Sequence, residues 1–273
     1  MCYYYGQKVT RAEYIRLMDL EKEVLRYEFL NRDIHNGFAY GNSAVLKPNE
    51  ARSNFDIVEM EWGLIPTYLK DRDAVNKFRN GYKDATGKWH IGYTTLNAKA
   101  ENLFISETGK KSMYADAAKS RRCLILSSGI YEWRHLPKLN KKTGLPLKAT
   151  EKYPYHITVK DAPYFYMAGI WQPWTDKETG EHIETFTVIT TSANKLMEQV
   201  HNSKKRMPTI LNEELAWEWM MEELSEERIS EIAGTQFPTE MMDACSVAKD
   251  FLASLDPATP FIYEDLPALE LSI

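Results

Sequence analysis

The chain contains 273 residues, of which 44% are hydrophobic and 27% are charged, with a net charge of −5 at neutral pH. That length suffices to bury one large core or two small ones. No stretch approaches the roughly 18 apolar residues of a membrane span, and no basic N-terminal region precedes an apolar run, so we expect a protein that is neither inserted nor exported. Three cysteines without CxxC or disulfide-like spacing predict a reducing, cytoplasmic compartment.

The charge is unevenly distributed. Residues 212–273 hold 15 acidic residues and only two basic ones, so residues 1–211 carry 32 basic against 24 acidic residues, a net charge of +8. A basic body with an acidic extension is compatible with a protein that holds phosphate groups on its body. Solvated surface charge is the alternative, and the sequence does not separate the two.

Cys2 is the first candidate for chemistry. The initiator methionine is normally trimmed from in front of a small residue such as cysteine, which would leave a free α-amine and a thiol on one residue. With reference pKa values of about 7.7 to 8.0 and about 8.5, both groups are partly nucleophilic at neutral pH. The amine would condense with an aldehyde to an imine, and the thiol would close a thiazolidine ring. A chance cysteine at this position is the alternative.

The first half of the chain predicts scaffold elements. The tyrosine run at residues 3–5 predicts a strand packed into the body, and residues 10–29 predict a helix from a capping box and a periodic apolar face. Residues 58–62 alternate apolar and acidic side chains and predict a half-buried strand that ends in WGLIP. Trp62, at this bend, packs in the core or stacks on a nucleobase. The polar segment 70–90 predicts a surface excursion.

Asn97 and Lys99 form the second candidate group, in the sequence TTLNAKAENL just before an expected helix start. An amide donates and accepts hydrogen bonds at once, which suits orienting an amine or a sugar hydroxyl. A helix N-terminus also favours a nearby phosphate. A simple capping role for Asn97 is the alternative.

Glu132 lies in RRCLILSSGIYEWRH, where residues 122–126 predict an apolar strand, 127–129 a turn and 130–133 a second extended piece. If the carboxylate between Tyr131 and Trp133 points inward, desolvation raises its pKa toward the range useful for proton transfer. If strand alternation turns it outward, it is an ordinary surface acid.

His201 is the last candidate. Residues 138–152 predict a loop, and the alternating residues 155–159 and 164–168 predict a β-hairpin about the turn at 160–163. A third strand follows, and then a short helix that delivers His201. Imidazole is the side chain best suited to proton transfer at neutral pH, although a structural role is common for a lone histidine.

The C-terminal part predicts two helices, residues 213–224 after the cap Asn212 and residues 225–233 before Gly234, followed by an acidic tail packed over the body. No phosphate-cradling glycine loop and no metal-ligand spacing occur, so the sequence predicts neither a cofactor nor a metal.

Five motifs, MC, WGLIP, LNAKAE, RCLILSSGIYEW and HNSKKRMPTIL, resemble in order and spacing those of the SOS-response-associated peptidase family, the abasic-site processing proteins. The resemblance spans about residues 1–211. It implies a covalent thiazolidine link between Cys2 and an abasic site in single-stranded DNA. It also implies that Asn97 positions the sugar and the amine, that Glu132 is a catalytic proton acceptor, and that His201 assists proton transfer.

The resemblance further implies that Lys99, Lys204 and Arg206 hold the DNA backbone and that Trp62 stacks beside the lesion. Two departures affect the phosphate contacts. Tyr4 replaces an arginine of the family's N-terminal motif, and Lys99 replaces another arginine with a point charge in place of a bidentate fork.

We therefore predict one α+β domain, residues 1–273, with mainly antiparallel strands in a barrel-like core and helices outside. Its predicted function is an abasic-site sensor of the SOS response with lyase-like imine chemistry, cytoplasmic, nucleoid-associated when bound to single-stranded DNA, and without an obligate protein partner. A thiol peptidase with Cys2 as its nucleophile, which would cleave its own leader or another chain, is the first alternative. A non-catalytic single-stranded DNA binder is the second.

Overall fold

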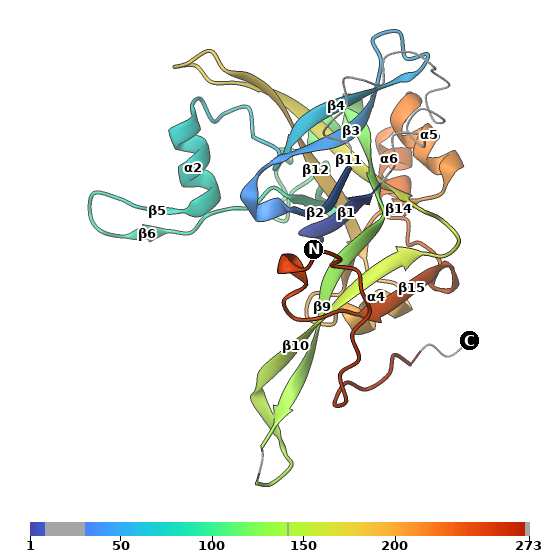
Figure 1. Cartoon of the computed structure of the whole chain (residues 1–273). Helices are drawn as coiled ribbons and strands as arrows, with labels where there is room; N and C mark the ends of the chain where they lie inside the picture. Colours follow the sequence, from blue (N-terminus) through green and yellow to red (C-terminus); the bar gives the residue numbers. More distant parts are fainter. Residues whose placement is uncertain (9–30, 141, 271–273) are drawn as a thin grey trace.

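A closed five-stranded barrel forms the centre of the computed structural model, which describes residues 1–8, 31–140 and 142–270 (Figure 1). Around the ring the order is β12, β4, β3, β8, β11 and back to β12. The β4–β12 contact is parallel, and the other pairs are antiparallel. The strands are β3 (Asn42–Pro48), β4 (Phe55–Trp62), β8 (Arg122–Ser127), β11 (Phe165–Thr175) and β12 (His182–Ser192). The predicted helix at residues 10–29 lies outside the described residues.

The barrel strand β8 is buried along its whole length because apolar groups cover both of its faces. One face points into the barrel, and helix α5 (Glu213–Met221) packs on the other side. Trp219 of α5 donates its indole N–H to the carbonyls of Cys123 and Gly169, each at 3.1 Å. The continuous apolar run CLIL at residues 123–126 is the sequence signature of such a doubly covered strand.

A second sheet carries the N-terminus across one end of the barrel. Its order is β15, β10, β9, β1, β2, with all neighbours antiparallel. Its strands are β1 (Tyr4–Lys8), β2 (Asn31–Asn36), β9 (Gly129–Leu139), β10 (Pro146–Val159) and β15 (Met242–Ser246). The chain passes from the barrel into this sheet at residues 127–129 and returns at residues 160–164, so β9 and β10 are tied to the barrel at both crossings.

Two predictions for this region are wrong. Residues 155–168 do not form a hairpin, because β10 pairs with β9 and β15 whereas β11 pairs with β8, β12 and β14 (Ile210–Leu211). The predicted loop at residues 138–152 is largely strand, because β9 runs to Leu139 and β10 begins at Pro146. The paired ends of β9 and β10 project from the body as a two-stranded ribbon (Figure 1).

Short strands and helices complete the body. The surface excursion at residues 70–90 contains α2 and the small β5–β6 hairpin. Asn212 accepts a backbone hydrogen bond at the start of α5 as predicted, and Ser225, predicted as the first residue of the next helix, is the cap of α6. No helix among the described residues is both long and apolar enough to cross a membrane. The elements are α2 (Arg72–Asn80), β5 (Tyr82–Lys83), β6 (Trp89–His90), β7 (Asn97–Lys99), α3 (Ala115–Ser120), α4 (Lys195–Val200), β13 (Arg206–Pro208) and α6 (Glu226–Ala233).

Four 3-10 turns lie between these elements in the described ranges: η3 (Gly37–Ala39), η4 (Ala100–Asn102), η5 (Thr239–Met241) and η6 (Phe251–Ala253). The helix expected after Asn97 is thus only the single turn η4. The segment after α6 packs over the second sheet as predicted. Tyr153 donates its hydroxyl to Asp265 at 2.6 Å, and Gln199 of α4 donates to the carbonyl of Glu270 at 2.9 Å.

Candidate active site

A cleft of about 360 Å³ lies where β1, β9 and the turn after α4 meet. It brings together Glu132 from β9, His201 from the end of α4, and the N-terminal residue Met1, which are far apart in the sequence. Of the other predicted site residues, Tyr4 and Lys204 line the cleft. The lining residues that no prediction named are Tyr3, Phe38, Trp133, His135, Lys152 and Ser203.

The N-terminal amine lies between an imidazole and a carboxylate. The Met1 nitrogen is 3.1 Å from Nδ1 and 3.2 Å from Nε2 of His201, and 3.7 Å from Oε1 of Glu132. Nε2 of His201 is 3.8 Å from Oε2 of Glu132. The three groups therefore stand within reach of one another for proton transfer, directly or after a small displacement.

The protonation state of His201 follows from its partners. Nδ1 lies 2.8 Å from the carbonyl oxygen of Arg206, which only accepts hydrogen bonds, so Nδ1 carries the hydrogen in the neutral ring. Burial, followed by the positive charge of the N-terminal amine, lowers the pKa of His201 to about 4. The ring is neutral at pH 7, with the lone pair of Nε2 available to the amine.

Glu132 has the opposite shift. Its side chain is buried on the strand, as the inward-facing alternative required, and burial raises the pKa of its carboxyl to about 7 against the attraction of the N-terminal ammonium. Burial also lowers the pKa of the Met1 amine. At neutral pH Glu132 is near half ionisation, which suits a group that must both accept and return a proton.

Cys2 is fully buried between Met1 and Tyr3, which line the cleft, and is not itself among the lining residues. Its thiol donates to the carbonyl of Tyr4 at a sulfur to oxygen distance of 3.6 Å. Burial, and then the negative charge of Glu132, raise the pKa of this thiol above its ordinary value. The thiol is therefore protonated at neutral pH and needs a base to become a nucleophile.

Asn202 is a site feature that the sequence analysis missed. Its amide donates to the carbonyl of His135 at 2.8 Å, and its carbonyl accepts from the backbone N–H of His135 at 2.9 Å. This reciprocal pair fastens the turn that carries His201 to strand β9, three residues beyond Glu132. The asparagine in HNSKK was the available signal, because an amide can satisfy both backbone groups of one residue.

Asn97 does not line the cleft. It lies on β7 beside Val188 of β12 and is buried, and neither polar atom of its side-chain amide has a hydrogen-bond partner among the described residues. A buried amide without partners costs free energy and marks a place where a ligand or water would supply them.

The stacking role predicted for Trp62 is wrong. Its side chain is 1% exposed, packs against Tyr5 and Phe186, and donates its indole N–H to the carbonyl of Leu96 at 2.9 Å. In the WGLIP bend Gly63 has φ of +124°, and a Cβ there would stand 2.7 Å from the Tyr40 ring. The motif is thus a packed corner of the barrel.

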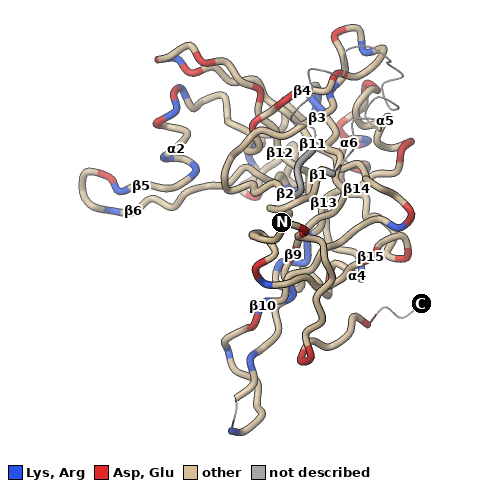
Figure 2. The backbone as a smooth tube through the Cα atoms, viewed as in Figure 1, with Lys and Arg blue, Asp and Glu red and all other residues tan. Residues whose placement is uncertain are grey.

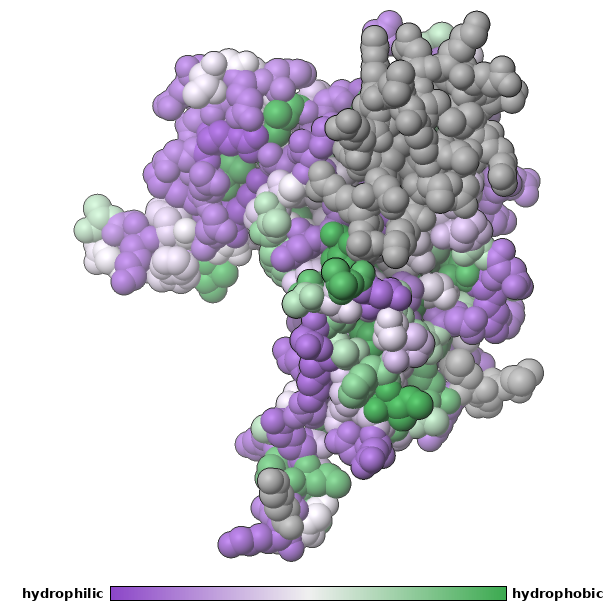
Figure 3. All heavy atoms as spheres, in the orientation of Figure 1, coloured by the Kyte–Doolittle hydropathy of each residue, from purple (hydrophilic) through white to green (hydrophobic). Residues whose placement is uncertain are grey.

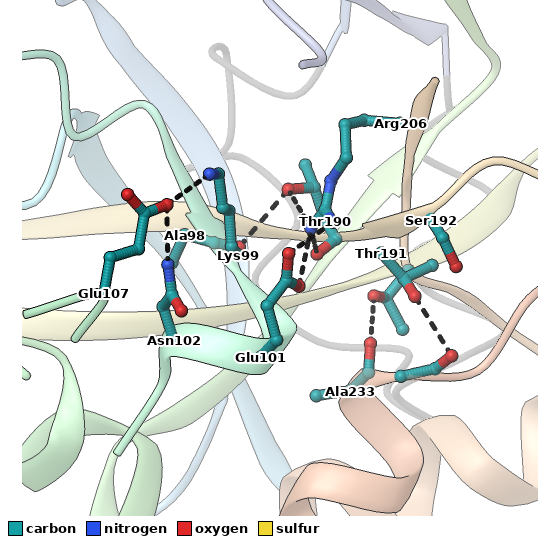
Figure 4. A network of polar contacts seen from close by, with 12 residues as sticks. Ala98, Lys99, Glu101, Asn102, Glu107, Thr190, Thr191, Ser192, Arg206 and Ala233 are labelled. Atoms are coloured by element: carbon teal, nitrogen blue, oxygen red, sulfur yellow. Dashed lines mark hydrogen bonds and ion pairs between the residues drawn. The ribbon is translucent and has the colours of Figure 1, made fainter. Parts of the chain in front are cut away.

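Lys99 and Arg206, predicted to hold phosphates, already have acidic partners (Figure 4). Nζ of Lys99 is 2.5 Å from Glu107, which also accepts from Asn102. The Arg206 guanidinium forms two hydrogen bonds to Glu101, at 2.6 and 3.0 Å, and donates to the carbonyl of Thr190. We call these side chains the ion-pair network. Neither Lys99 nor the Arg206 guanidinium is a free cation in this structure.

Tyr4 and Lys204 occupy positions where they could meet a ligand. The Tyr4 ring lies edge-on to Trp133, with 5.3 Å between ring centroids, at the wall of the cleft. Lys204 is exposed at the rim, and no described acidic residue forms an ion pair with it. Within the described part of the chain, no three His, Cys, Asp or Glu side chains gather as metal ligands would.

Residues 1–253 match the model of the protein family described as "SOS response associated peptidase (SRAP)". The architecture is a barrel flanked by a second sheet. One cleft in it is surrounded by a buried carboxylate, a neutral histidine and an N-terminal amine. The chain belongs to the SOS response associated peptidase family.

Two kinds of relatives support this assignment. The chain is 33% identical over 168 residues to the abasic site processing protein YoqW of Bacillus subtilis and 27% identical over 180 residues to the abasic site processing protein HMCES of Pongo abelii. These matches cover 62% and 60% of this chain, but only 58% and 45% of the relatives.

Among solved structures, a protein from Bacteroides thetaiotaomicron is 29% identical, with a TM-score of 0.72 over 96% of this chain and 100% of that one. A protein from Bordetella bronchiseptica, 18% identical with a TM-score of 0.65 over 90% of this chain and 100% of that one, shares the fold. The predicted fold class, a mainly antiparallel barrel core with helices outside, is confirmed.

Proposed function

We propose that this protein captures abasic sites in single-stranded DNA by forming a thiazolidine through Cys2, and so shields the lesion during the DNA-damage response. The observation that carries the proposal is the N-terminal amine held 3.1 to 3.7 Å from His201 and Glu132 in an open cleft. Curated family members named as abasic site processing proteins support the choice of substrate.

Removal of Met1 is the first requirement. In the structure the Met1 amine occupies the cleft, whereas the thiol belongs to the next residue and is buried. Amine and thiol are placed to close a five-membered ring only when both are on Cys2. Cleavage of the Met1–Cys2 bond would move the amine onto Cys2 and vacate the part of the cleft that Met1 lines.

The reaction then proceeds in two bond-forming steps. The Cys2 amine attacks the aldehyde carbon of the ring-opened sugar, and the carbinolamine loses its hydroxyl as water to leave an imine. The thiol sulfur adds to the imine carbon, and the thiol proton ends on the nitrogen. The net products are one thiazolidine and one water molecule, with no oxidant or cofactor consumed.

The described side chains supply the required proton transfers. Glu132, with a pKa of about 7, accepts a proton from the attacking amine and returns it to the departing hydroxyl. It lies close enough to the thiol for its charge to raise the thiol pKa, so it is also the base available for the second step. Neutral His201 accepts a proton at Nε2, because Nδ1 is committed to the Arg206 carbonyl.

The remaining site residues take supporting roles in this proposal. Asn97, whose buried amide has no protein partner among the described residues, would meet the sugar only if bound DNA reached β7. Tyr4 and Lys204 would contact the strand at the rim of the cleft. Lys99 and Arg206 would contact phosphate only after leaving Glu107 and Glu101. Nucleoid association would follow from binding to DNA.

The test uses protein whose intact mass shows that Met1 has been removed. Incubation with single-stranded DNA containing one abasic site should give a heat-stable adduct, and the Cys2→Ala variant should give none. The Cys123→Ala variant, which removes a buried thiol that does not line the cleft, serves as the matched control and should retain the adduct. A heat-stable adduct with Cys2→Ala would refute the thiazolidine mechanism.

A thiol peptidase is the second candidate, because the family description carries that name and Cys2 is near a histidine and a carboxylate. The hydrogen bond made by the Cys2 thiol disfavours the peptidase. Sγ of Cys2 donates to the Tyr4 carbonyl, and no hydrogen bond joins it to His201 in the described residues. Release of a cleaved peptide without a DNA adduct would favour the peptidase.

A further inference from the structure

We infer that the ribbon formed by the paired ends of β9, from Arg134, and β10, up to Lys152, is an arm that binds the phosphate backbone of the DNA strand flanking the lesion. The inference rests on the proposed function and assigns a binding surface outside the cleft. The arm projects from the body as a two-stranded ribbon (Figure 1). Three observations support it: its charge, the state of its lysines and its continuity with the cleft.

Positive charge is concentrated in this arm. The 19 residues from 134 to 152 include six lysines and arginines and one acidic residue, a net charge of +5 in a chain whose net charge is −5. Figure 2 shows the basic residues spaced along the projecting ribbon. Because the rest of the chain is acidic on balance, the arm is the segment to which a polyanion would be attracted.

The arm's lysines differ in whether they are neutralised. Lys138 lies 3.0 Å from Glu151, the arm's one acid, and is compensated. Lys142, Lys148 and Lys152 are exposed, and no described acidic residue forms an ion pair with any of them. Unpaired cations can release counterions from a nucleic acid without first breaking an internal ion pair.

The arm is continuous with the cleft. Lys152 of β10 stands opposite His135 of β9, and both residues line the cleft together with Lys204 of the facing turn. From Lys152 to Pro146 the strand advances about 20 Å at 3.3 Å per residue. That is the length of about six nucleotides in a strand stacked as in a double helix, at about 3.4 Å each. A strand whose abasic sugar is in the cleft would therefore meet the arm for about six nucleotides on one side.

The arm also exposes apolar side chains near its end. Leu139, Leu145 and Leu147 are 63%, 64% and 43% exposed, whereas hydrophilic residues predominate along the rest of the ribbon (Figure 3). If the arm's lysines bind the phosphates of a DNA strand, these leucine side chains would contact the bases of that strand. The excess of unpaired lysines favours a nucleic acid over an apolar protein surface as the partner.

The test compares two doubly substituted proteins. Lys142→Ala with Lys148→Ala removes two free cations from the arm. Lys83→Ala with Lys88→Ala removes two exposed lysines without described acidic partners from the other projecting hairpin, β5–β6, and is the matched control. Affinity for an intact single strand without an abasic site is measured over a range of salt concentrations, so the result does not depend on cross-linking.

The arm variant should lower the slope of log affinity against log salt by about 1.4, at about 0.7 per phosphate contact, and the control should leave it unchanged. Lys142→Arg with Lys148→Arg should restore the slope. Equal slopes for the wild type and the arm variant, or an equal loss in the control, would overturn the inference.

Failure of this inference is distinguishable from failure of the proposed function. If no adduct forms with wild-type protein, the cross-linking proposal fails, yet the salt slopes on intact strands still report on the arm. If the adduct forms but the arm variant binds intact strands as the wild type does, only the arm is ruled out.

Discussion

The charged groups of the cleft are buried and those of the ion-pair network are solvated, although Arg206 contacts both sites. In the cleft, burial raises the pKa of Glu132 to about 7 and lowers the pKa of His201 to about 4. In the network, Glu101 and Glu107 are exposed and meet cations in solvated ion pairs. Arg206 joins the two, because its carbonyl orients His201 while its guanidinium is held by Glu101.

This difference indicates where chemistry can occur. A desolvated, weakly compensated acid near neutral pKa can exchange protons during a reaction, whereas a solvated carboxylate beside an arginine stays ionised. An exposed ion pair contributes only about 0 to 1 kcal/mol. We therefore expect substitutions in the cleft to affect the reaction strongly, and substitutions in the network to affect it weakly.

The largest effect is expected for Glu132→Gln. Loss of the group that accepts and returns the proton should slow adduct formation by about 10² to 10⁴-fold, the usual contribution of general acid and base catalysis. Affinity for an intact strand should change little, because Glu132 is buried in the floor of the cleft. Single-turnover cross-linking at saturating DNA measures the rate, and a wild-type rate would show that Glu132 is not the proton carrier.

The opposite pKa shifts also predict opposing effects of pH on stability. The contribution of Glu132 to the free energy of unfolding is fully present below its ordinary pKa of 4.5, because burial favours the neutral carboxyl. This contribution is lost as pH rises through about 7, a change of about 3 kcal/mol. Stability from neutral His201 is present above 6.5 and is lost as pH falls through about 4, by a similar amount. Between pH 4.5 and 6.5 the pH dependences of these two contributions to the free energy of unfolding cancel.

Single substitutions should separate these contributions. Across pH 4.5 to 6.5, the free energy of unfolding should rise with pH in Glu132→Gln, where only the histidine contribution remains, and fall with pH in His201→Gln. Urea unfolding at pH 4.5, 5.5 and 6.5 measures both slopes relative to the wild type. Parallel profiles for the three proteins would contradict the assigned pKa shifts.

A smaller effect is expected for Glu101→Gln in the network. The substitution removes the charge that holds the Arg206 guanidinium, while the Arg206 carbonyl can remain on His201. The cross-linking rate should change by about threefold or less, consistent with an exposed ion pair. The released guanidinium should make the salt dependence of DNA binding steeper by about 0.7. A hundredfold loss of rate would place Glu101 in the reaction itself.

The smallest effect is a contrast between two lysines. Lys204→Ala should reduce the salt slope of DNA binding by about 0.7, because Lys204 is an uncompensated cation at the rim of the cleft. Lys99→Ala should leave the slope unchanged, because Glu107 already neutralises Lys99. If Lys99→Ala reduced the salt slope as much as Lys204→Ala, the ion pair between Lys99 and Glu107 would have to open when DNA binds.

The strand positions of the candidate site could be predicted, but its distances could not. Glu132 was placed on an extended segment and His201 after a short helix from local patterns, and both are found there. Their meeting depends on how β9 packs beside the turn after α4, and on the Asn202 contacts that fasten them. No local pattern encodes such a contact between residues 67 positions apart.

The errors have equally specific causes. Trp62 is in phase with the half-buried Val58 and the buried Met60, so the alternation that predicted the strand also placed the indole inside. Residues 155–168 showed alternation on both sides of a turn, a pattern that is the same whether two strands pair together or join different sheets. The ribbon at 138–152 has solvent on both faces, so it lacks the alternation by which strands are recognised.

The two crossings between the sheets have a consequence for local opening. Strands β9 and β10 enter the second sheet from β8 and leave it into β11, so releasing them from the body disturbs barrel strands at both ends. Amide protons near residues 130–133 and 155–157 should therefore exchange with deuterium as slowly as those of the barrel, whereas those near the arm's tip should exchange quickly. The carboxylate in the cleft is thus anchored to the most slowly opening part of the molecule.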